Sequence, residues 1–87
     1  MINPVDNPVE WALFLYELED AEEHLKNLIK QLHSKSDIDE MEFKTHLFHV
    51  YEHLNRAWHS RNTMGEISST QWHANSQLPA SLKLFED

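Results

Sequence analysis

The sequence predicts an all-α fold: a long antiparallel helical hairpin with a short C-terminal tail, which we expect to dimerise into a four-helix bundle. Two long stretches each carry apolar residues at intervals of three and four, the period of an amphipathic helix. The 87-residue chain contains one Gly and three Pro, too few turn-forming residues for several short strands. We therefore treat residues 1–87 as one helical-hairpin domain.

The first predicted helix covers about residues 8–33. Asn7 is a favourable N-cap residue, Pro8 suits the first helical position, and Glu10 can reach back to the cap. No further Gly or Pro interrupts the stretch. One apolar stripe with a 4-3-4-3 spacing runs along it and consists of Trp11, Phe14, Leu18, Ala21, Leu25, Leu28 and Leu32.

The second predicted helix covers about residues 38–64. Ser36 or Asp37 is the expected N-cap, and three acidic residues follow in the first turn, where the helix dipole favours negative charge. Gly65 is the expected C-terminal stop. Because the linker between the two helices is short, they should pack antiparallel. The second apolar stripe consists of Phe43, Leu47, Val50, Leu54 and Ala57.

Residues 66–87 form the predicted tail, which we expect to pack on the hairpin. Residues 68–70 are suited to capping a short helix over residues 71–74, since Ser and Thr side chains satisfy the first N–H groups of a helix. The apolar side chains expected to hold the tail in place are Trp72, Leu78, Leu82 and Phe85.

The amount of apolar surface predicts a homodimer. Four leucines are placed at the a positions of a heptad, in the contact between the helices: Leu18, Leu25, Leu47 and Leu54. Further large apolar side chains flank that contact, and leaving each in water would forgo roughly 1.5–3 kcal/mol. A second hairpin would bury them; coverage by the tail of the same chain is the alternative. The predicted dimer-interface residues are Leu15, Ile29, Phe48, Tyr51 and Trp58.

The opposite flank of the predicted hairpin collects histidines and carboxylates. In an antiparallel pair linked near residue 35, Glu17 should lie level with His53, and His24 level with His46. Imidazole and carboxylate are common ligands of divalent transition metals. Solvated ion pairs are the alternative, because specific motifs such as His-Glu-x-x-His are absent from the sequence. The candidate metal ligands are Glu17, Asp20, His24, His46, His49 and His53.

Composition narrows the range of partners. Seven Lys and Arg against fifteen Asp and Glu give a net charge of −8 with His neutral. Nucleic-acid binding depends on cationic groups that release counterions, so we expect no nucleic-acid partner. No stretch is apolar enough to span a membrane, and we expect no membrane partner. The absence of Cys and of a signal-type N-terminus leads us to expect a cytoplasmic protein.

The sequence offers no catalytic residue. Nucleophile motifs and dinucleotide fingerprints are absent, and a single glycine cannot build a phosphate-binding loop. We expect a non-enzymatic, acidic homodimer that needs no cofactor and acts as a protein-interaction or adaptor module. Its contact surface would be the acidic run at residues 17–23 or an apolar groove. The alternative is a bundle that binds a divalent transition metal and acts as a metal-dependent hydrolase.

Overall fold

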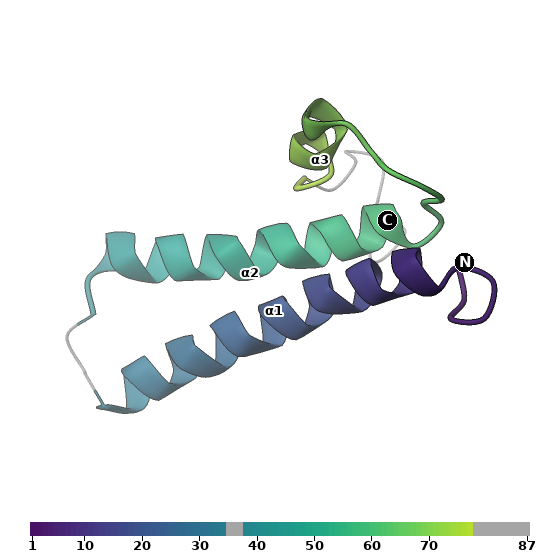
Figure 1. Ribbon diagram of the computed structural model, residues 1–87. Helices are drawn as coiled ribbons and strands as arrows, with labels where there is room; N and C mark the ends of the chain where they lie inside the picture. The colour runs from purple at the N-terminus through teal and green to yellow at the C-terminus, as the bar shows by residue number, and fades with distance from the viewer. Residues whose placement is uncertain (35–37, 78–87) are drawn as a thin grey trace, which may run out of the picture.

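The computed structural model describes residues 1–34 and 38–77, which form two long helices and a short third one (Figure 1). α1 spans Pro8–Ser34, α2 spans Glu40–Ser60 and α3 spans Ser69–Ala74. Figure 1 shows α1 and α2 running antiparallel, with α3 above α2. The described residues contain no strand, and none of their helices is long and apolar enough to cross a membrane. The all-α prediction is confirmed.

A compact N-terminal turn precedes α1 and ties the chain start to the end of α2. The side-chain oxygen of Asn3 accepts hydrogen bonds from two backbone N–H groups of the turn, at 3.0 and 2.8 Å. The first helical bond runs from the Trp11 N–H to the Asn7 carbonyl at 2.8 Å. Ile2 is buried, and its N–H donates to the Arg61 carbonyl at 2.8 Å. The open end of the hairpin is therefore closed by backbone contacts.

α2 begins later and ends earlier than the sequence predicts. Asp39 is the N-cap, because its carboxylate accepts from the backbone N–H three residues on at 2.8 Å. At the other end the Thr63 N–H donates to the Ser60 carbonyl at 3.1 Å, a three-residue turn that replaces the helical pattern. Gly65 has a φ of 84°, which favours glycine, but it lies in the connection to α3. A positive-φ glycine therefore marks a turn here, several residues beyond the helix end.

The contact surface between α1 and α2, here called the seam, differs from the one predicted from the apolar stripes. Its buried apolar side chains are Ala21 and Leu28 of α1 and Val50 and Ala57 of α2. The four leucines placed there from the sequence are instead 38–49% exposed. Each helix is rotated so that one edge of its stripe, together with the neighbouring polar residues, faces its partner. Small alanines let the backbones approach, and the rotation brings charged and imidazole side chains of the two helices into contact.

The segment after α2 returns to the hairpin. Ser68 is the N-cap of α3, and its hydroxyl accepts from the Gln71 N–H at 3.1 Å. Beyond α3, the side-chain amide of Asn55 donates to the carbonyl of the buried Ser76 at 2.8 Å. The described part of the tail is therefore held against α2 by hydrogen bonds.

Two sets of predicted residues lie outside the described part of the chain. They are the N-cap candidates Ser36 and Asp37 and the tail residues Leu78, Leu82 and Phe85. Trp72, the remaining predicted tail contact, lies on α3 with the Arg56 guanidinium carbon 4.2 Å from its ring centroid. Trp72 therefore contacts the hairpin by a cation–π interaction with Arg56 of α2.

Candidate functional site

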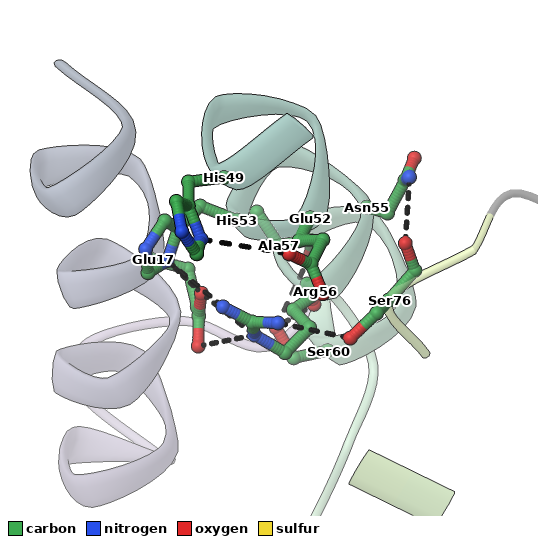
Figure 2. A network of polar contacts seen from close by, with 9 residues as sticks. All are labelled: Glu17, His49, Glu52, His53, Asn55, Arg56, Ala57, Ser60 and Ser76. Carbon is green, nitrogen blue, oxygen red and sulfur yellow. Dashed lines mark hydrogen bonds and ion pairs between the residues drawn. The ribbon is translucent and has the colours of Figure 1, made fainter. Parts of the chain in front are cut away.

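A polar network joins α1 to α2 across the seam (Figure 2). The Nδ1 atom of His53 lies 2.8 Å from Oε2 of Glu17. The Nε–H of Arg56 donates to both carboxylate oxygens of Glu17, at 3.1 and 3.2 Å. The side chains of Glu17, His53 and Arg56 are 20%, 15% and 8% exposed. The ion pair is therefore largely removed from water, and Glu17 lies level with His53 as the sequence predicts.

The contacts of His53 favour one of its tautomers. Its Nδ1 atom lies 2.8 Å from a Glu17 oxygen and 3.0 Å from Nη2 of Arg56. One nitrogen cannot donate to the carboxylate and accept from the guanidinium at the same time. The carboxylate contact is the shorter, and charge-assisted hydrogen bonds are the stronger ones. The geometry therefore favours the arrangement in which Nδ1–H donates to Glu17.

Arg56 also connects the hairpin to the segment after α3. Its Nη1–H donates to the Ser76 hydroxyl at 2.9 Å, beside the bond between Asn55 and the Ser76 carbonyl (Figure 2). The same side chain pairs with Glu17 of α1, so it connects three parts of the chain. The contact with Ser76 was not foreseen, since no periodic pattern links a short polar segment to a helix twenty residues away.

Three histidines gather beside this network. The ring of His24 on α1 stacks on the rings of His53 and His49 on α2, with centroid separations of 5.1 and 5.7 Å. The Nδ1 atom of His49 lies 3.6 Å from Oε1 of Glu52. The cluster concentrates imidazole groups next to the Glu17–His53 pair.

The structure brings together four of the six predicted metal ligands, Glu17, His24, His49 and His53. His46 lies 3.9 Å from Glu42 of its own helix, and Asp20 is exposed on α1. His24 and His46, predicted to lie level, both line a polar cavity of about 370 Å³. Over residues 1–34 and 38–77, no three His, Asp or Glu side chains are grouped in an arrangement suited to a metal ion. The metal site stays a prediction.

The second candidate site is an apolar face on one side of the hairpin. By helical geometry its residues lie roughly 100° around each helix from the seam, on the same side of both helices. Each of its ten large side chains is 36–55% exposed, and the rings of Phe48 and Tyr51 lie 5.8 Å apart. All five predicted dimer-interface residues belong to it. The apolar face consists of Leu15, Leu18, Leu25, Ile29 and Leu32 of α1 and Leu47, Phe48, Tyr51, Leu54 and Trp58 of α2.

The apolar face is large for a single small chain. At roughly 200 Å² for an aromatic side chain and somewhat less for Leu or Ile, ten half-exposed side chains present on the order of 700 Å², close to the roughly 800 Å² buried by each partner of a standard interface. The largest apolar patch on a soluble monomer covers about 300–600 Å². The face therefore has the area of a protein–protein interface.

No family model, curated protein or solved structure matches the chain significantly. A function therefore has to be inferred from the geometry of the structure, that is, from the polar network and the apolar face.

Proposed function

We propose that this protein is a homodimeric helical-bundle module in which two copies pair through the apolar face, and that the assembly acts by contacting another protein. The proposal rests on the exposure of the apolar face. A lone soluble hairpin gains most by burying its leucines between the helices. This hairpin places the largely buried Glu17, His53 and Arg56 there and leaves the leucines of its apolar face in contact with water.

A second copy is the occupant that fits this face best. A two-fold axis sets the same surface of each copy against the other, so an apolar face meets an apolar face of equal size. Two hairpins packed in this way give a four-helix bundle with a leucine-rich core. Exposed Glu22 lies in the same row of α1 as Leu15 and Ile29, and exposed Lys44 lies in the row of α2 that holds Tyr51 and Trp58. Because their charges are opposite, Glu22 of one copy can pair with Lys44 of the other.

The surface left for a protein partner is the acidic outer side of α1. Its exposed carboxylates lie away from both the seam and the apolar face. With a net charge of −8, the chain favours a partner with a basic surface, because complementary charge accelerates encounter and disfavours wrong partners. These carboxylates are Glu19, Asp20 and Glu23.

Sedimentation velocity on the wild type and two variants tests the pairing. We expect a wild-type dimer at micromolar concentration and a dimer dissociation constant at least about 30-fold higher for L25Q/L54Q, because each lost leucine contact is worth on the order of 1 kcal/mol or more. L13Q is the matched control, since Leu13 is 59% exposed on α1 but lies outside the apolar face. A monomeric wild type, or equal dissociation of L13Q, would contradict the proposal.

The metal-binding alternative rests on the gathering of His24, His49 and His53 beside Glu17. In the described part of the chain these side chains are not arranged around a common point, so metal binding would have to reorient them. Neutral imidazole nitrogen is a preferred ligand of zinc and nickel. Elemental analysis of the purified protein, with thermal melts in added zinc, nickel or manganese, separates the two proposals. Bound metal and a raised melting temperature that H24Q abolishes would support the alternative. A blank result on both counts would exclude it.

A further inference from the structure

A pocket of about 520 Å³ opens where the connection after α2 and α3 come back toward the start of α1. This volume lies in the range of small-molecule sites, about 300–1,000 Å³. Its apolar walls come from three parts of the chain: Val9, Leu13 and Tyr16 of α1, Ile67 of the connection, and Trp72 of α3. On α1 these side chains lie across the seam from the apolar face, so the pocket and the proposed dimer surface are separate.

The charged groups of the pocket leave it negative. Three carboxylates and one guanidinium line it, Glu10, Glu17, Glu66 and Arg56, which gives 3 negative and 1 positive charges, a net −2. Arg56 is already bound to Glu17, and its guanidinium carbon lies 4.2 Å from the Trp72 centroid. In the described part of the chain, the ion pairs involve neither Glu10 nor Glu66. Two carboxylates therefore remain to meet a ligand.

We propose that this pocket binds a small organic cation with an apolar body and a protonated amine. The apolar walls contact the body of such a molecule, as in ligand sites that combine mostly apolar lining with a few placed polar groups. Glu10 and Glu66 pair with the ammonium, and Tyr16, 60% exposed, offers an aromatic face that attracts a cation. An anion would meet two carboxylates and no cation that is free of a carboxylate partner. A neutral molecule would gain the walls alone.

Three probes of the same size separate these cases: benzylamine, benzyl alcohol and phenylacetate. Each is titrated into the full chain while the methyl resonances of Val9, Leu13 and Ile67 are followed by ¹H–¹³C NMR. We expect benzylamine to shift all three and to bind roughly three- to tenfold more tightly than benzyl alcohol, the range for one or two partly exposed ion pairs. Phenylacetate should cause no shift. The proposal would be overturned if phenylacetate bound more tightly than benzylamine. It would also be overturned if benzylamine did not shift the methyl resonances of the pocket.

A pair of double variants tests the role of the carboxylates. E10Q/E66Q should reduce benzylamine affinity to the level of benzyl alcohol while benzyl alcohol still shifts the same methyls, which shows that the pocket is intact. E19Q/E23Q removes the same charge from the outer side of α1 and should keep the threefold to tenfold preference, apart from a general screening effect. A preference that survives in E10Q/E66Q, or disappears equally in both variants, would refute the assignment.

The pocket and the dimer can fail independently. L25Q/L54Q changes only the apolar face, so it should leave benzylamine affinity unchanged even where it dissociates the dimer. A loss of benzylamine binding in this variant would mean that the methyl shifts report on the contact between copies, and would contradict a pocket within one chain.

Discussion

The seam and the apolar face of the hairpin differ in what each removes from water. The seam largely removes one carboxylate, one guanidinium and one imidazole from water beside four buried apolar residues, whereas the apolar face leaves ten large side chains 36–55% exposed. Fully burying one such side chain is worth roughly 1.5–3 kcal/mol, so the hydrophobic effect alone would favour the reverse. The difference indicates that the seam sets which residues lie level, whereas the apolar face is the surface that the proposed dimer would cover.

The polar seam is suited to this role because its contacts are directional. A hydrogen-bonded ion pair tolerates only one register, whereas leucines pack almost as well after a shift. Glu17 contacts His53 and Arg56 at once, and a slide of one helical turn would break both contacts. We infer that the network selects one alignment of α1 and α2, on which the continuity of the apolar face depends.

The largest expected effect comes from removing the guanidinium of the seam. R56M keeps an unbranched side chain but removes the bonds to Glu17 and Ser76 and leaves the carboxylate beside His53 alone. Breaking a largely buried pair costs several kcal/mol, and because Glu17 is 20% exposed we expect a loss of about 2–3 kcal/mol in the free energy of unfolding. Urea denaturation at one fixed protein concentration measures it.

R61M is the matched control for that variant. Arg61 also lies over a tryptophan, with its guanidinium carbon 3.6 Å from the Trp58 centroid, but it has no carboxylate contact among the described residues and its Nη1–H donates to a backbone carbonyl. We expect a loss below about 1 kcal/mol. Equal losses for R56M and R61M would show that the network does not distinguish the seam from the surface.

A smaller effect should follow from removing the imidazole that stacks on two others. The ring of His24 lies 5.1 Å from that of His53 and 5.7 Å from that of His49. H24Q removes both contacts and leaves the bonds between Glu17 and Arg56 in place. We expect a loss of about 1 kcal/mol in the free energy of unfolding.

Urea denaturation at one fixed protein concentration tests the histidine contribution. H33Q, at the exposed end of α1, is the control and should leave the free energy of unfolding nearly unchanged. Equal losses for H24Q and H33Q would mean that the stacked imidazoles make no net contribution.

The sequence predicts the helices and their alignment well, because both depend on local signals. Pro8 and the uninterrupted 3-4 period identify α1, and a short linker places Glu17 level with His53. The predicted rotation of each helix about its axis was wrong, and the reason is physical. The apolar stripe on each helix is wider than one helix–helix contact requires. Its period therefore does not indicate which edge of the stripe faces the other helix. In the structure, the edge that carries Glu17 and His53 faces the other helix.

Much of the site depends on contacts that sequence spacing does not encode. The density of polar residues around Asn55 and Arg56 was a signal, but their common partner Ser76 lies beyond a turn and a third helix. The pocket is harder still to predict, since its walls come from α1, the end of α2, the connection and α3. Such a cavity is defined by how the tail returns, which depends on hydrogen bonds rather than on periodicity.

The most direct test of pairing is an isotope-filtered NOE experiment on a mixture of ¹³C-labelled and unlabelled copies. We predict cross-peaks between copies from the methyl groups of Leu25 and Leu54 to the ring of Tyr51, and none from Leu13. Absence of cross-peaks between copies at millimolar concentration, or cross-peaks from Leu13 in place of the apolar face, would contradict the proposed dimer.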